Sequence, residues 1–141
     1  MDSAHNTDPE YIASMRKRLS SKSLHLIPYA HADHAWTHTR QWHIERYLLI
    51  LNEVLDIMNE HPDFTWMNDN VLHMVEPFLE HCPERADELR RRIEEGRLEI
   101  TTGVLALVRP TQVGGETFIR NIVMGRKYLR ALLPDYDTRI Y

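Results

Sequence analysis

The residues best suited to chemistry lie in one short segment, HADHAW at 31–36. It follows an apolar run, 24–30, that predicts a short buried strand. If strand geometry persists through the segment, His31 and Asp33 project to the same side, because residues two apart share a face. An imidazole nitrogen and a carboxylate oxygen placed together form half of a zinc-type site. The same triplet is also typical of an ordinary polar loop.

The elements that must position this segment alternate along the chain. Apolar runs predict strands at 24–30, 64–67 and 98–102, and 137–141 resembles the start of a fourth. Helical periodicity and capping residues predict helices over 39–60, 71–79 (broken near Pro77), 84–95 and 116–133. Such alternation predicts an α/β fold with about three to four parallel strands and crossover helices. Pro28 lies within the first expected strand, where it removes a backbone donor.

Each expected helix has an apolar side that predicts how it packs. The inward residues are Ile44, Tyr47, Leu48, Leu51, Val54, Leu55 and Met58 in the first helix, Ala86, Leu89 and Ile93 in the third, and Ile119, Ile122, Val123 and Leu129 in the last. The arginines at 90–92 are surrounded by glutamates, so we interpret them as a solvated helix face rather than an anion site.

In parallel α/β folds the chemistry gathers at the C-terminal ends of the strands. Three loops should meet there, at 31–36, 68–70 and 104–115. Their polar residues are His31, Asp33, His34, Asn68, Asp69, Asn70 and Arg109. We therefore expect a metal site or a sugar site at this edge of the sheet.

Composition restricts the classes of partner. The net charge of −4 argues against general nucleic-acid or membrane-surface binding, and no run is apolar enough to cross a bilayer. Cys82 is the only cysteine and the N-terminus has no signal-peptide pattern, so we expect a reducing, cytoplasmic location. Residues 1–22 are expected to form a loosely ordered polar arm with about one helical turn, followed by one domain over 23–141.

The order of several motifs resembles a known family. The pattern HxDxxW at 31–36 is followed by ILNEVLDIM, HPDFTW, EEGRLEI and GGETFIRNIVMGRKYL. In this order the motifs are similar to the N-terminal part of glycoside hydrolase family 38, the retaining α-mannosidases. The resemblance runs from about residue 24 to the end of the chain.

This resemblance implies the N-terminal part of a seven-stranded β/α barrel-like domain with zinc. The family's HxD metal ligands carry over onto His31 and Asp33, and its sugar-subsite tryptophan onto Trp36. Asp69, at the end of the second expected strand, is a candidate substrate-binding carboxylate, with a turn or helix-cap role as the alternative. The fourth metal ligand and the acid/base carboxylate of the family have no counterpart among these residues.

Arg109 departs from the family pattern. It aligns with the aspartate that serves the family as nucleophile and third metal ligand, and no aspartate lies between Gly103 and Gly115. A guanidinium can neither attack an anomeric carbon nor ligate zinc. The sequence therefore leaves two readings of Arg109. It binds a carboxylate or phosphate of a different substrate, or it marks a copy without catalysis.

The resemblance implies zinc-dependent hydrolysis of α-mannosidic bonds in a carbohydrate substrate. Because such a barrel needs roughly 250 residues, we expect this chain to be a fragment or half of a split protein and to be inactive alone. We also expect it to self-associate or to bind a partner chain that completes the barrel. The alternatives are a non-catalytic carbohydrate- or metal-binding remnant and a metal-dependent hydrolase such as a sugar deacetylase.

Overall fold

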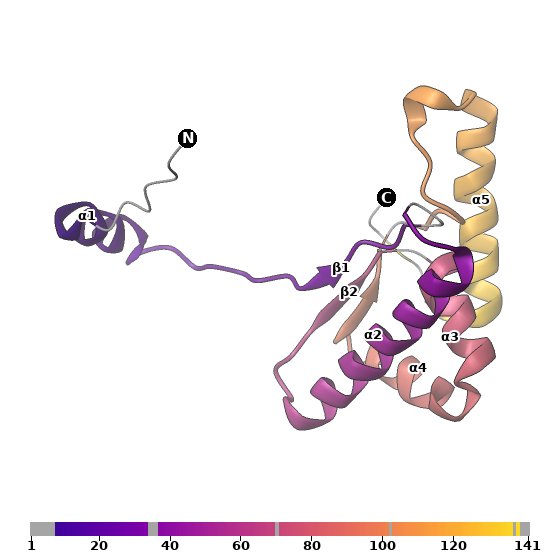
Figure 1. The fold of residues 1–141 in the computed structure, drawn as a ribbon, viewed down its shortest axis with the longest axis horizontal. Coiled ribbons are helices and arrows are strands. Elements are labelled where there is room, and N and C mark those ends of the chain that lie inside the picture. The colour runs from indigo at the N-terminus through magenta and orange to yellow at the C-terminus, as the bar shows by residue number, and fades with distance from the viewer. Residues whose placement is uncertain (1–7, 34–36, 70, 102, 137, 139–141) are drawn as a thin grey trace.

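The structure is a computed structural model that describes residues 8–33, 37–69, 71–101, 103–136 and 138. Its elements are, in order, α1 (Pro9–Leu19), β1 (Tyr29–Ala30), α2 (Arg40–Glu60), β2 (Trp66–Asn68), the π-helical η1 (Val71–Val75), α3 (Glu76–His81), η2 (Pro83–Arg85), α4 (Ala86–Glu94), β3 (Leu98–Ile100), η3 (Pro110–Gln112) and α5 (Gly115–Leu132). Figure 1 shows the helices gathered around a small sheet, with α1 at the end of an extended segment.

The three strands form one parallel sheet in the order β1-β2-β3, which confirms the predicted α/β class. Tyr29 pairs with Met67, and Met67 pairs with Glu99. The carbonyl of Pro28 accepts the Met67 N–H at 3.0 Å. The proline thus joins the edge of the sheet through its acceptor, and its missing donor is not needed there.

The first strand is much shorter than the sequence predicted, since only Tyr29 and Ala30 are paired. The preceding apolar residues are exposed rather than buried: Leu24 is 84% exposed and Leu26 is 78% exposed. No described element covers these residues. The expectation of a buried strand over 24–28 was therefore wrong.

The core lies between the sheet and the helices that follow its strands. It contains Tyr47, Leu51, Val54, Leu55 and Met58 of α2, Met74, Val75 and Phe78 of η1 and α3, Leu89 and Ile93 of α4, Leu98 and Ile100 of β3, and Leu129 and Leu133 at the end of α5. Thr39 caps α2 by accepting the Trp42 N–H at 3.2 Å, so the helix begins where the sequence predicted. The predicted apolar side of α2 is therefore confirmed at its central residues, which are buried in this core.

Two helices differ from their predicted form. Helix α1 has 11 residues and buries none of them, so the N-terminal arm is more helical than one turn; Asp8 caps it and Pro9 starts it. In α5 only Gly125 and Leu129 are buried. Ile119 is 61% exposed and Val123 is 57% exposed, because the described elements cover only the C-terminal half of this helix.

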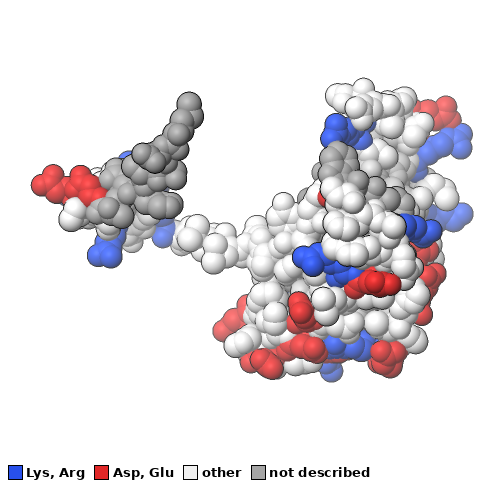
Figure 2. All heavy atoms as spheres, viewed as in Figure 1, with Lys and Arg blue, Asp and Glu red and all other residues white. Residues whose placement is uncertain are grey.

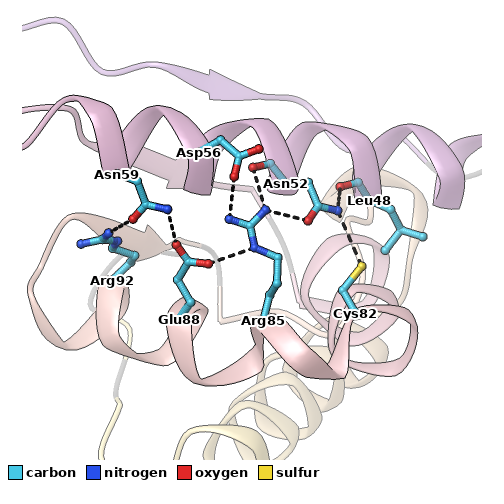
Figure 3. Close-up of polar contacts among 8 residues, drawn as sticks. All are labelled: Leu48, Asn52, Asp56, Asn59, Cys82, Arg85, Glu88 and Arg92. Carbon is cyan, nitrogen blue, oxygen red and sulfur yellow. Dashed lines mark hydrogen bonds and ion pairs between the residues drawn. The ribbon is translucent and has the colours of Figure 1, made fainter.

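A polar network joins α2 to α4 (Figure 3). Arg85 donates to the side chains of Asp56 at 2.8 Å, Glu88 at 2.9 Å and Asn52 at 2.9 Å. Arg92 is buried and bonds Glu95 at 2.8 Å. The interpretation of 90–92 as a solvated face was therefore wrong for Arg92, whose hydrogen bonds allow its burial. Figure 2 shows charges of both signs interspersed on the face that it presents.

The loop after β3 is held against α5. The backbone N–H of Leu105 donates to the Asn121 carbonyl at 3.1 Å, and the Asn121 side chain bonds both the N–H (3.0 Å) and the carbonyl (2.7 Å) of Ala106. Gly125 lies beside this crossing, where a Cβ would collide with the backbone of Gly103 and Leu105. The absence of a side chain at Gly125 therefore allows the loop that leads to Arg109 to approach the helix.

None of the helices in the described part of the chain is both long and apolar enough to span a lipid bilayer.

Candidate metal and substrate site

The centre of the site is the His31 ring, which lies just beyond β1. Its Nδ1 is 2.8 Å from Oδ2 of Asp69, and the same oxygen accepts the backbone N–H of Ala32 at 3.0 Å. The Asp69 side chain is 12% exposed, whereas the His31 side chain is 58% exposed. Because a carboxylate oxygen accepts hydrogen bonds, this contact favours a ring proton on Nδ1, the nitrogen that faces Asp69.

The other ring nitrogen faces Asp33. His31 Nε2 lies 3.4 Å from Asp33 Oδ1. Two ligands at normal distances from a tetrahedral zinc ion are about 3.3 Å apart, so the pair fits a shared metal. Among the described residues no group of three histidine, cysteine, aspartate or glutamate side chains could hold a metal ion. Within the described residues, His31 Nε2 and Asp33 Oδ1 are two candidate ligand atoms, and Asp69 contacts the opposite nitrogen of the ring.

Helix α2 supports the Asp33 end of the segment. The Tyr47 hydroxyl donates to the Asp33 carbonyl at 2.6 Å, and His43 Nδ1 lies 3.3 Å from the same hydroxyl. Burial, together with the nearby carboxylates of Asp33 and Asp69, raises the pKa of Tyr47 to about 12. The phenol is thus kept protonated as a donor, and it ties the segment that carries His31 and Asp33 to the core.

A hollow of about 420 Å³ opens on one side of the His31–Asp33 pair. Its lining includes both of these residues, His73 from η1, and Arg109 from the loop after β3. Three separate strand ends therefore contribute to one site, as expected for the C-terminal edge of a parallel sheet. The space is of the size that small-molecule sites usually have.

A second hollow of about 360 Å³ lies on the α2 side of the same pair. Trp42 and His38 stack there with ring centroids 3.9 Å apart, and the Arg46 guanidinium lies 5.8 Å from the centre of the Trp42 ring. The two hollows meet at His31 and Asp33, which line both.

The predicted site residues have different outcomes. His31, Asp33 and Arg109 come together around one hollow, whereas Asp69 is not on its lining and contacts Nδ1 at the edge of the His31 ring. Trp36, with His34 and Asn70, lies outside the described residues, as does the expected fourth strand apart from Thr138. The roles assigned to these residues stay predictions.

Sequence reasoning missed three contributors. Tyr47 was counted only as part of an apolar stripe, and His43 and His73 were not assigned to the site. The spacing of His43 and Tyr47, one helical turn apart, could have indicated a polar pair on the inner face of the helix. No sequence signal pointed to His73, because its position on the lining is set by the course of η1.

Comparison with known proteins gives a family. The profile described as "Glycosyl hydrolases family 38 N-terminal domain" matches residues 21–137. The chain is 27% identical over 107 residues to a protein of Halalkalibacterium halodurans named "Putative mannosylglycerate hydrolase", covering 75% of this chain and 12% of that protein. It is 28% identical over 79 residues to "Alpha-mannosidase 2" of Spodoptera frugiperda, covering 55% of this chain and 7% of that protein.

Solved structures show the same fold. An α-mannosidase from Enterococcus faecalis V583 superposes with a TM-score of 0.67 at 20% identity, covering 75% of this chain and 12% of its own. A family 38 glycosyl hydrolase from Enterococcus faecalis gives a TM-score of 0.64 at 20% identity, with 79% and 13% covered. The chain thus spans about an eighth of such proteins. With its profile match over 21–137, the chain belongs to glycosyl hydrolase family 38, within the N-terminal domain.

Proposed function

We propose that this chain supplies the metal-binding edge of a glycoside hydrolase acting on α-mannosides, in which His31 and Asp33 would hold a zinc ion. The observation that carries the proposal is the 3.4 Å separation of His31 Nε2 from Asp33 Oδ1, with Asp69 holding the opposite ring nitrogen. Family membership and the names of the two relatives support the substrate class. The family match also disfavours a sugar deacetylase.

Bound zinc would coordinate the oxygens of a carbohydrate and act as a Lewis acid. The chain's own residues orient the ligands: Asp69 holds the tautomer of His31, and Tyr47 fixes the Asp33 backbone. The carboxylate Asp33 is 45% exposed, so a substrate can reach this side of the site. Retaining hydrolysis also needs a nucleophile and an acid/base carboxylate about 5 Å apart. Asp33 is a ligand, and Arg109 cannot be a nucleophile.

We therefore expect the isolated chain to bind zinc weakly and not to hydrolyse an aryl α-mannoside above background. Titration calorimetry with zinc should give a one-to-one isotherm that Asp33→Ala abolishes. Asp63→Ala is the matched control, because Asp63 is exposed on the loop before β2, at the opposite end of the sheet. Zinc binding that survives Asp33→Ala would place the metal elsewhere and overturn the proposal.

The second candidate is a non-catalytic carbohydrate- or metal-binding protein, which Arg109 favours because it replaces the expected nucleophile. An aryl α-mannoside assay with added zinc separates the two functions when it is run on the chain completed by the remaining parts of a family 38 protein. Turnover that requires Asp33 supports the hydrolase. Sugar binding without turnover supports the binding protein.

A further inference from the structure

We infer that Arg109 binds an anionic substituent, a carboxylate or a phosphate, on the carbohydrate that occupies the hollow beside His31 and Asp33. This inference rests on the proposed function, since it names the substrate class of the same site. It is carried by the position of Arg109 on the wall of that hollow and by the state of its side chain.

The Arg109 guanidinium has no hydrogen bond, ion pair or ring contact within the described part of the chain; only its backbone carbonyl is used, by the Gln112 N–H at 2.9 Å. Many other arginines are engaged. Ion pairs are formed by Arg85, Arg90, Arg91, Arg92, Arg97 and Arg120. A guanidinium with five donors and no protein partner, on the wall of a site, matches the paired oxygens of a carboxylate or phosphate.

The backbone before Arg109 is held in place. Asn121 bonds the backbone of Leu105 and Ala106, and the close approach at Gly125 fixes the start of the loop on α5. Pro110 follows directly and restricts the backbone of Arg109 to extended conformations, as its ψ of 112° shows. The guanidinium is thus presented from an anchored loop, which lowers the entropy lost when a ligand binds.

The charges around the hollow favour a ligand that is both polar and anionic. Asp33 is the acidic side chain on the lining, and it faces His31 at 3.4 Å. A metal ion between these two would neutralise the carboxylate and leave Arg109 as the cation facing the ligand. An uncharged sugar would bind the metal ion alone. An anionic sugar would also form hydrogen bonds with the Arg109 guanidinium.

The test titrates the protein by NMR with mannose, mannuronate and mannose 6-phosphate in low-salt buffer with zinc added. We expect the anionic sugars to bind about fivefold more tightly than mannose or better, because charge-assisted bidentate hydrogen bonds exceed neutral ones. Arg109→Gln should remove this advantage. The matched control is Arg16→Gln, which makes the same charge change on exposed α1.

An advantage for mannuronate alone, or for mannose 6-phosphate alone, supports the inference and identifies the anion. Equal binding of all three sugars, or an advantage that survives Arg109→Gln in a variant with an unchanged fold, overturns it. Zinc titration of Arg109→Gln keeps the two proposals apart. If zinc binding is lost in Asp33→Ala but kept in Arg109→Gln, the metal site is supported independently of how the anionic sugars bind.

Discussion

Asp69 and His31 are 38 positions apart in the chain, yet Asp69 Oδ2 lies 2.8 Å from His31 Nδ1. The contact links the end of β2 to the residue after β1, because the two strands are parallel neighbours. One carboxylate oxygen both orients the imidazole and accepts the Ala32 N–H. Asp69 thus acts as a positioning residue for the proposed metal ligand, and its expected role as a substrate contact stays a prediction.

Asp69→Ala should weaken zinc binding about 10- to 100-fold, the usual effect of losing the hydrogen-bond partner of a ligating histidine. The His31 ring would then rotate freely and sample both tautomers. Titration calorimetry measures the affinity, and ¹⁵N chemical shifts of the ring measure the tautomer. Unchanged affinity and an unchanged tautomer in Asp69→Ala, with the Asp63→Ala control also unchanged, would contradict the positioning role.

Tyr47→Phe should lower the free energy of unfolding by about 1 kcal/mol, the net value of a typical hydrogen bond. The variant removes the 2.6 Å bond to the Asp33 carbonyl but keeps the buried ring. Urea denaturation followed by circular dichroism gives the value. The control is Tyr11→Phe on exposed α1, for which no loss is expected. Equal stability of the two variants would show that the Tyr47 bond contributes nothing.

Gly125→Ala should destabilise the fold by about 1–3 kcal/mol, as overpacking does in tight sites. The new methyl group meets the backbone of Gly103 and Leu105, which cannot move as a flexible side chain would. Gly115→Ala is the matched control, since no atom lies within 4 Å of a Cβ built there. Thermal unfolding of both variants tests the difference, and equal melting temperatures would contradict the close approach.

Arg85→Met should lower the free energy of unfolding by about 1–3 kcal/mol, because Asp56 and Glu88 lose a charged donor. Partial burial raises the pKa of Glu88, but hydrogen bonds from Arg85 and Asn59 together hold it below its usual value of 4.5. A lowered carboxyl pKa stabilises the fold above pH 4.5, and this stabilisation is lost as the pH falls through the folded-state pKa. The variant should therefore lose less stability on acidification.

Urea titrations of wild type and Arg85→Met at neutral and acidic pH measure both effects. Arg90→Met serves as the control, because Arg90 pairs with the exposed Asp87 and surface pairs contribute little. The same acid sensitivity in wild type and Arg85→Met would argue against the lowered pKa of Glu88.

Self-association should depend on an exposed apolar patch of α5. Ile119, Val123 and Met124 are 61%, 57% and 49% exposed, and such adjoining apolar residues favour contact with another chain. Light scattering across a concentration series should show association of the wild type and less of it in Val123→Glu. Gln112→Glu, at an exposed position outside α5, is the control because it adds the same single negative charge. A wild type that stays monomeric at every concentration would contradict this prediction.

Much of the fold follows from the sequence because it depends on local periodicity and on capping. The apolar side of α2, its start near residue 39 and the parallel direction of the strands follow from local patterns. The proximity of His31 to Asp33 was also predicted, because residues two apart in an extended segment share a side. The family resemblance depended on motif order, and the profile match confirms it.

Tertiary contacts decided the rest. The prediction that residues 24–28 are buried was wrong, because an apolar segment forms a buried strand only where other elements cover it. The role of Asp69 beneath His31, the bond from Tyr47 to Asp33 and the burial of Arg92 each join residues from different elements. Local sequence cannot encode such pairs, because strand register and helix packing set which side chains meet across the sheet.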